Sequence, residues 1–125
     1  MPGFDEPVLD RVAKQREVEL TTFGRLSGRE HRRVLWASTD GRRVFVRSGQ
    51  GLTRDWPKNL IAAGTGILHL EGHDVRVRGR LLEEPEEARA VSRLHRAKYG
   101  DYVKPSSGDE PLTPGEQASF ELVPA

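Results

Sequence analysis

The feature that most constrains the fold of this sequence is a stretch of strict alternation between residues 75 and 82. Its two sides are occupied by Val75, Val77 and Leu81 and by Arg76, Arg78 and Arg80. A period of two places apolar side chains on one face of a strand and charged side chains on the other. The stretch therefore predicts a half-buried strand whose arginine face meets solvent and acidic neighbours. Aromatic residues, at 6% of the chain, are too scarce for that face to stack on bases as an RNA site.

Other short apolar and β-branched runs predict further strands, because each ends at turn residues. The predicted strands are Val18–Phe23, His31–Thr39, Arg43–Arg47, Ile67–Leu70, Val75–Leu82 and Ala118–Val123. Asp40 and Gly41 tolerate the positive φ angles of a hairpin turn, so the second and third strands are expected to pair. Gly72 predicts a second hairpin between the fourth and fifth strands.

Three segments carry the spacing and end signals of helices. They are Asp5–Arg16, Asp55–Ala63 and Pro85–Tyr99. Asp55 is expected to cap the second helix, and Gly64 is expected to end it. The third helix opens with acidic residues and closes with basic ones, which suits the helix dipole. Residues 104–115, rich in Pro, Ser and Gly, predict a loop.

The 125 residues show no change of composition, which predicts a single domain over residues 1–125 with one core. Only 35% of residues are hydrophobic and 31% are charged, so a thin core aided by a bound ligand or a dimer interface is expected. With 20 Lys and Arg against 19 Asp and Glu, the charge balance gives no reason to expect nucleic acid as a partner.

Several classes of site are excluded or disfavoured by residue content. The chain has no cysteine, which excludes disulfides, thiolate metal sites and cysteine nucleophiles. His69 and His73 bracket a turn without a third ligand nearby, so no metal site is expected. Ser27 and Ser48 do not fit the nucleophile elbow of a hydrolase. Without a signal-peptide pattern or a membrane-length apolar run, a cytoplasmic protein with no integral membrane segment is expected.

Two glycine-flanked turns carry the clearest indication of a ligand. They are Gly24–Arg29 and Arg47–Gly51, and the second runs into the expected helix start near Arg54. Glycines let backbone amides converge on an anion, and hydroxyls and arginines add further donors. A helix N-terminus contributes partial positive charge. Together these features predict a phosphorylated cofactor.

Six strands and two or three helices, joined mainly by hairpins, predict a mainly β, α+β fold. We expect an antiparallel barrel of about six strands with helices covering its ends.

The residues of the first turn carry a resemblance to a known family. Residues 20–28 read LTTFGRLSG and resemble the T-T-x-G-R-x-[ST]-G motif of the deazaflavin-dependent nitroreductases, which belong to the split β-barrel flavin-binding superfamily related to pyridoxamine-phosphate oxidases. The later features follow the same order as in that family: a Trp-containing strand, a DG hairpin, a V-x-S-x-G-G-like turn, D-W-x-x-N-L, another hairpin, and an E-E-A-R helix ending near paired tyrosines. The resemblance covers roughly residues 18–102.

The resemblance implies an oxidoreductase that binds the 8-hydroxy-5-deazaflavin coenzyme and passes a hydride to a small quinone-like, nitroaromatic or conjugated electrophile. The coenzyme carries the chemistry, so no catalytic side chain is expected. The coenzyme contacts that it implies are Arg25, Ser27, Gly28, Ser48, Gly49, Gln50, Gly51, Trp56 and Asn59, and the possible substrate contacts are Tyr99 and Tyr102. Trp56 could instead be core, and the two tyrosines could close the barrel end.

The sequence departs from the family at two positions where lysines are common, which here are Leu26 and Gln50. Other cations could compensate, namely Arg29, Arg32, Arg47, Arg54 and Lys58. Two alternatives therefore stay open: an FMN-binding oxidoreductase of the same superfamily, or a non-catalytic barrel that binds a cofactor or small ligand. Similar barrels commonly dimerise, so a homodimer is also expected to be possible.

Overall fold

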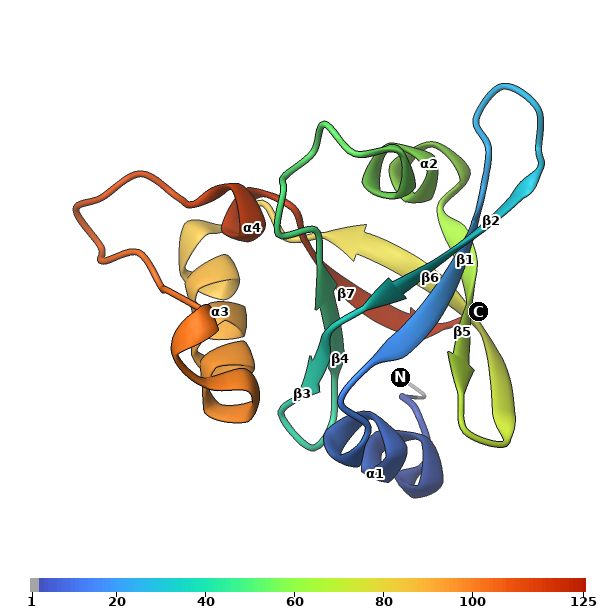
Figure 1. Ribbon diagram of the computed structural model, residues 1–125, viewed down its shortest axis with the longest axis horizontal. Helices are drawn as coiled ribbons and strands as arrows, with labels where there is room; N and C mark the ends of the chain where they lie inside the picture. The colour runs from blue at the N-terminus through green and yellow to red at the C-terminus, as the bar shows by residue number, and fades with distance from the viewer. Residues whose placement is uncertain (1–2) are drawn as a thin grey trace.

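A computed structural model describes residues 3–125 and contains one sheet of seven strands, all paired antiparallel in the order β2-β1-β5-β6-β7-β4-β3 (Figure 1). The strands are β1 (Val18–Phe23), β2 (Glu30–Leu35), β3 (Ala37–Thr39), β4 (Val44–Arg47), β5 (Thr65–Leu70), β6 (His73–Leu81) and β7 (Ser119–Pro124). The sheet curls into the split barrel expected from the sequence, so the predicted α+β fold class is confirmed.

The barrel curls because its two edge strands are consecutive in the chain. β2 and β3 lie at opposite ends of the strand order, yet only Trp36 separates them. At this residue the chain leaves its pairing with β1, which ends at Leu35, and begins pairing with β4 at Ala37. The sequence predicted one continuous strand over residues 31–39, and this was wrong because the division raises the strand number to seven. No Gly or Pro marks the change of partner, so local residue preferences could not reveal it.

The barrel interior is filled by alternate side chains of the strands, as the period of two predicts. The fully buried members include Leu20, Val44, Val46, Leu68, Val77, Phe120 and Leu122. On β6, Arg76, Arg78 and Arg80 are exposed opposite Val77, which confirms the predicted alternation. Arg80 also meets acidic neighbours as expected, because its Nη2 lies 2.7 Å from Glu121 and 3.2 Å from Glu87.

Two helices cover the open ends of the barrel (Figure 1). At one end lies α1 (Glu6–Lys14), which buries Val8 and Val12 and is capped by Asp5, whose carboxylate accepts a bond from the Val8 amide. At the other end lies α2 (Asp55–Ala63), which buries Trp56 and Leu60.

Helix α2 sits close to the sheet because a glycine makes room for it. A Cβ atom at Gly79 would lie 2.6 Å from Cγ of Leu60, so only glycine allows this approach. Gly64 ends the helix in the left-handed conformation, as predicted. The predicted cap was wrong: the N-cap is Arg54, without a side-chain cap bond, and Asp55 is the first helical residue.

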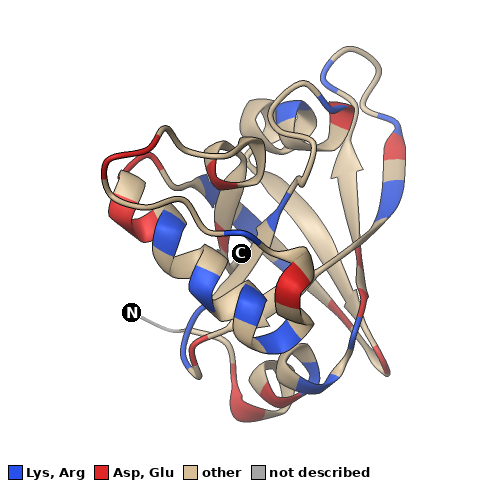
Figure 2. Ribbon diagram, turned by 60° about the vertical axis from the view of Figure 1, so that its left-hand side comes forward, with Lys and Arg blue, Asp and Glu red and all other residues tan. Residues whose placement is uncertain are grey.

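Helix α3 (Pro85–Tyr99) lies beside β3 and β4, outside the barrel (Figure 1). Val91 packs with Phe45 of β4 and with Leu82 in a second, smaller apolar cluster. Figure 2 shows acidic residues at its start and basic residues along its outer surface, as the sequence predicted. Within residues 3–125, no helix has both the length and the apolar character needed to cross a bilayer.

After α3 the chain forms a 3-10 turn (Gly100–Tyr102) and then a short helix, α4 (Pro114–Gln117), that returns toward α3. The sequence predicted only a loop over residues 104–115. The helix forms because Thr113 and Glu116 make a capping box, in which each side chain bonds to the backbone amide of the other residue.

Candidate functional site

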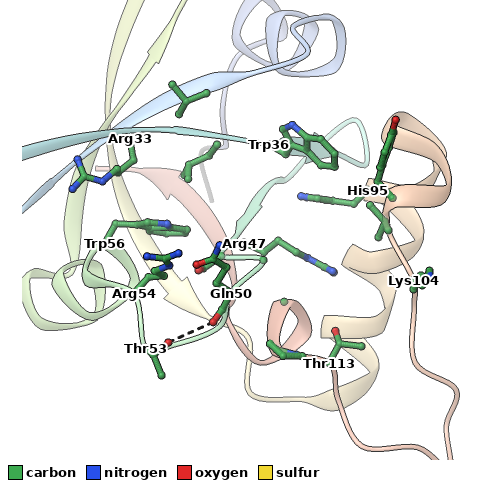
Figure 3. Close-up of a pocket in the computed structure, with 18 of the residues that line it drawn as sticks. Arg33, Trp36, Arg47, Gln50, Thr53, Arg54, Trp56, His95, Lys104 and Thr113 are labelled. Carbon is green, nitrogen blue, oxygen red and sulfur yellow. Dashed lines mark hydrogen bonds between the residues drawn. The ribbon is translucent and has the colours of Figure 1, made fainter.

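A cavity of about 780 Å³ lies between the barrel and the α3–α4 side of the molecule (Figure 3). Its lining comes from the end of β2 with Trp36, the turn that follows β4, the start of α2, His95 of α3, and the segments 102–104 and 113–115. This volume is within the range of small-molecule sites in proteins. Segments distant in sequence thus converge on one cavity.

Five of the residues predicted from the resemblance line this cavity. They are Ser48, Gly49, Gln50, Trp56 and Tyr102. The indole of Trp56 is 7% exposed and also packs on Phe120, with 5.7 Å between ring centroids. Trp56 therefore combines the two roles that the sequence left open, because it is part of the core and part of the cavity wall.

The turn after β4 presents its backbone to the cavity. The Gly51 amide donates to the Ser48 carbonyl at 3.0 Å, and the Ser48 amide donates to the Ala118 carbonyl at 3.1 Å. Gly51 has a φ of 87°, which favours glycine. Within residues 3–125, the amides of Gly49 and Gln50 donate no hydrogen bond. Two amide donors at the cavity wall are thus available to a ligand.

The other predicted residues are not among those that line the cavity. They are Arg25, Ser27, Gly28, Gly51, Asn59 and Tyr99. The Asn59 side chain is 2% exposed, and its Oδ1 accepts bonds from the Arg25 amide at 3.2 Å and from Arg25 Nη1 at 2.8 Å. Asn59 thus ties the first glycine turn to α2. Ser27 stays within its own turn, where its hydroxyl accepts a bond from the Arg29 amide.

Tyr99 supports the cavity wall from behind. Its ring stacks on Trp36 with 4.1 Å between centroids and 5° between planes. Its hydroxyl donates to the Arg16 carbonyl at 2.6 Å and accepts from the Ala37 amide at 3.1 Å. Burial raises the pKa of this phenol. Tyr102 differs, because it is 80% exposed at the rim and meets Trp36 edge-on.

The cations near the cavity are not all those that the sequence offered as substitutes for the missing lysines. Of those candidates, Arg47 and Arg54 line the cavity, whereas Arg29, Arg32 and Lys58 do not. Two further cations of the lining, Arg33 and Lys104, were missed from the sequence. Asp55 is the one carboxylate among the lining residues, and it lies 3.7 Å from Arg25 Nη2. The lining is therefore predominantly basic.

A polar cluster behind the cavity holds Arg47 in place. Its Nη2 donates to Ser92 Oγ at 2.6 Å, and Ser92 Oγ donates to Glu116 at 2.8 Å. Burial lowers the pKa of Arg47 to about 10, and the negative charge of Glu116 opposes this effect. Gly115 leaves room for the side chain, because a Cβ atom there would lie 3.2 Å from Arg47 Cδ.

Glu116 is fully buried and ionised at neutral pH. Burial acts to raise its pKa, but the hydrogen bonds that it accepts from Ser106, Thr113 and Ser92 outweigh burial and lower the pKa to about 2. Arg47 and Glu116 thus form a charge-balanced pair bridged by Ser92.

His95 is the other buried polar residue of the cavity. It is 1% exposed, and its Nδ1 lies 2.7 Å from Ser38 Oγ. Burial lowers the pKa of His95 to about 3, and the positive charge of Arg47 acts in the same direction. The imidazole is therefore neutral at physiological pH. The sequence held a signal for it that was not used: Ser92 and His95 interrupt the apolar stripe of α3 next to Val91.

Outside this cavity, the histidines of the β5–β6 hairpin have local partners. Thr21 Oγ1 lies 2.7 Å from His69 Nε2, and Asp74 lies 2.8 Å from His69 Nδ1. In the part of the chain that the structure describes, no group of three or more His, Cys, Asp or Glu residues could hold a metal ion.

Comparison with known families gives a match over nearly the whole chain. Residues 8–121 match the sequence model of a family described as "uncharacterized protein conserved in bacteria (DUF2255)". The chain belongs to this family. The DUF2255 assignment names no activity, and a search of curated proteins finds no match.

Solved structures share the fold of this DUF2255 protein at low sequence identity. A domain-swapped dimer has 19% identity over 86% of this chain and 80% of its own, with a TM-score of 0.67. A proposed 5-nitroimidazole antibiotic resistance protein from Bacteroides thetaiotaomicron has 12% identity over 96% and 79%, with a TM-score of 0.66. An F420 reductase has 18% identity over 100% and 96%, with a TM-score of 0.58. The resemblance to the split-barrel deazaflavin-dependent nitroreductases is thus confirmed for the fold.

Proposed function

We propose that this protein is an oxidoreductase that uses the reduced 8-hydroxy-5-deazaflavin coenzyme to reduce a small quinone-like, nitroaromatic or conjugated electrophile. The observation that carries the proposal is a convergence. The second glycine turn and Trp56, which the resemblance associates with the coenzyme, line the same cavity. That the fold is shared with an F420 reductase, named after a deazaflavin coenzyme, supports this choice.

The residues of the cavity fit such a coenzyme by chemical type. Trp56 offers an aromatic surface to a flat ring system, and the free amides of Gly49 and Gln50 offer donors to its polar edge or phosphate. Arg33, Arg54 and Lys104 supply positive charge for an anionic tail. When bound, the coenzyme would supply the hydride, and the protein would contribute binding, orientation and electrostatics.

For the first glycine turn we propose a positioning role in place of the phosphate contact that the resemblance implies. Arg25 is engaged by Asn59 through two hydrogen bonds and also approaches Asp55. These contacts fix the start of α2, where Arg54 and Trp56 reach the cavity. The turn would then act on the coenzyme through the helix.

The wall opposite Trp56 would shape the space for the substrate. Trp36 is held flat by its stacking on Tyr99, and Tyr102 stands exposed at the rim. A substrate bound between the walls would be kept from water on both faces. Tyr102 is then placed to donate a hydrogen bond or proton to the reduced product.

A second candidate is a barrel that binds FMN or another small ligand without catalysis. Leu26 and Gln50 favour it, because two expected lysines are missing and Leu26 is 97% exposed. The two candidates differ in which flavin-type ligand the cavity accepts.

A titration distinguishes these candidates. Purified protein is titrated with oxidised deazaflavin coenzyme and, separately, with FMN, while tryptophan fluorescence is followed, since both Trp36 and Trp56 line the cavity. We expect saturable quenching by the deazaflavin and a several-fold weaker affinity in Arg54→Ala. Arg78→Ala on the outer face of β6 is the matched control and should bind as wild type does. Quenching by FMN alone, or by neither ligand, would contradict the proposal.

We also propose that the protein forms a homodimer through the open side of β2. This strand pairs only with β1 within the described residues, and Val34 on it is 58% exposed. Light scattering after size exclusion should give twice the 14.0 kDa mass of one chain. The mass of a single chain across the concentrations tested would exclude the dimer.

A further inference from the structure

Buried polar atoms without partners point to a second element of recognition in the cavity. Within residues 3–125, the buried side-chain atoms that lack a hydrogen-bond partner are Thr22 Oγ1, Arg47 Nε and His95 Nε2. Two of these three atoms belong to residues that line the cavity. Leaving a buried donor or acceptor without a partner is costly, so such atoms indicate groups that a ligand satisfies.

The two side chains approach the same end of the cavity from different elements. His95 projects from α3 and Arg47 from β4, and Figure 3 shows both reaching into the space below Trp36. They are close enough for the charge of Arg47 to contribute to the lowered pKa of His95. A single ligand atom group bound there can meet both.

The partner of His95 determines which of its nitrogens carries the hydrogen. The neutral ring has one N–H, and Ser38 Oγ is hydrogen-bonded to Nδ1. If Nδ1 accepts from Ser38, the serine hydrogen is satisfied and Nε2–H alone remains free. If Nδ1 donates, the serine hydrogen and the Nε2 lone pair are both left over. The first tautomer satisfies more groups, and it turns Nε2 into a donor.

Arg47 adds a second donor without adding uncompensated charge. Its positive charge is balanced by Glu116 through Ser92, while its Nε–H stays free. A site of this kind does not need a ligand with a full negative charge. It can bind a neutral carbonyl oxygen and stabilise that oxygen further as it becomes negative.

We propose that Arg47 and His95 form a two-donor site for the oxygen of the substrate, and that the substrate class is a conjugated carbonyl compound, an enone or a quinone. For the reaction this inference rests on the proposed function, whereas binding of the oxygen does not require the coenzyme. Nitroaromatic acceptors become a weaker choice, because the site receives one oxygen between two converging donors.

The chemistry balances for an enone as follows. Hydride adds to the β-carbon and forms a C–H bond, while the C=C electron pair moves to give an enolate with its charge on oxygen. Both electrons and this hydrogen come from the coenzyme of the proposed function, which is oxidised. The donors of Arg47 and His95 stabilise the enolate oxygen, and a proton from solvent at the Tyr102 rim completes the reduced product.

The site can be tested without the coenzyme by using 4-nitrophenolate as a coloured oxyanion probe. At a pH where this probe is ionised, we expect saturable binding to wild-type protein and a shift of its absorption to shorter wavelength, because hydrogen bonds stabilise the phenolate ground state. The probe 4-nitroanisole has the same ring without the oxyanion, and it should bind at least tenfold more weakly.

Two substitutions of one residue separate ligand binding from a structural role. His95→Gln retains a donor near the position of Nε2 but loses the contact with Ser38, whereas His95→Asn retains the position of Nδ1 and loses Nε2. We expect His95→Gln to bind 4-nitrophenolate within about threefold of wild type and His95→Asn to bind it about tenfold or more weakly. A structural role alone predicts the reverse order, and its appearance would overturn the proposal.

Two further readouts protect the test against misfolding. Thermal unfolding of each variant shows that it is folded, and imidazole ¹⁵N chemical shifts, assigned by difference with His95→Gln, should show hydrogen on Nε2 of His95. Hydrogen on Nδ1, or no binding of 4-nitrophenolate by wild type, would overturn the proposal. Failure of deazaflavin to bind while 4-nitrophenolate binds would overturn the proposed function and leave this site standing.

Discussion

The two glycine turns, residues 24–29 and residues 47–51, have similar composition and very different surroundings. Both contain arginine, serine and glycine. The first extends from β1 to β2 beyond the end of the barrel (Figure 1), and its Leu26 is almost fully exposed. The second follows β4, buries Ser48 and faces the cavity. Composition gave both turns the same predicted role.

The difference lies in what stands behind each turn. Behind the second turn, Arg47 reaches a buried cluster of Ser92 and Glu116, so its position is fixed from the protein interior. The first turn has one anchor, the pair of bonds from Arg25 to Asn59. A turn becomes a binding element when the interior holds it against a cavity, and this depends on residues far away in sequence.

The largest expected effect comes from breaking the cluster behind the second turn. Glu116→Gln removes the charge that balances buried Arg47 and should lower the free energy of unfolding by about 2–3 kcal/mol. Urea denaturation measures the change. Ser27→Ala in the first turn is the matched control and should stay within about 0.5 kcal/mol of wild type. A cost below 0.5 kcal/mol for Glu116→Gln would show that the cluster does not stabilise the fold.

The next effect concerns pH, because burial keeps His95 neutral in the folded protein. Its folded pKa of about 3 lies below the unfolded value of 6.5, so the unfolded chain binds more protons between these values and stability falls as pH drops through this window. Between pH 6.5 and 4.5 the loss should be about 2 kcal/mol. Glu116 does not contribute there, because its depressed pKa removes stability only between 4.5 and about 2.

Urea denaturation at the two pH values, with His95→Gln as comparison, checks this prediction. The variant lacks the imidazole and should lose clearly less stability than wild type over the same range. Equal losses in the two proteins would assign the pH dependence to other groups.

A smaller effect is expected at the anchor of the first turn. Arg25→Ala and Asn59→Ala should each cost about 1 kcal/mol, and the double variant should cost little more than either, because both remove the same contact. A double-mutant cycle in urea measures the coupling. Arg29→Ala in the same exposed turn serves as control. Additive costs would mean that the bonds between Arg25 and Asn59 do not hold the turn.

The smallest expected effect sharpens the comparison between the turns directly. Gln50→Lys adds a cation to the cavity lining and should strengthen coenzyme binding a few-fold. Leu26→Lys adds the same charge to the exposed first turn and should have a weaker effect, because exposed charges are screened. Fluorescence titration compares the two. A larger gain from Leu26→Lys would place the anionic tail at the first turn.

Much of the fold could be predicted because it depends on local patterns. The alternation over residues 75–82, the Asp40-Gly41 turn and the stop at Gly64 are all confirmed. The division at Trp36 could not be predicted, because it reflects a change of pairing partner and not a local preference.

The site was less predictable for the same physical reason. The turn of Ser48–Gln50 and Trp56 could be expected at a ligand site from the resemblance, and the structure places them in one cavity. His95, Arg33 and Lys104 reach that cavity from separate elements, so only the tertiary fold brings them together. The polar residues Ser92 and His95 within an apolar helix stripe were a usable signal that the sequence interpretation passed over.

The central claim is that the cavity at the second turn, and not the first turn, receives the deazaflavin coenzyme. Backbone amide NMR of ¹⁵N-labelled protein titrated with the oxidised coenzyme tests it most directly, because glycines in both turns give separate signals. The account predicts large shifts at Gly49 and Gln50 with little change at Gly24 and Gly28. Shifts confined to the first turn, or none at either, would contradict it.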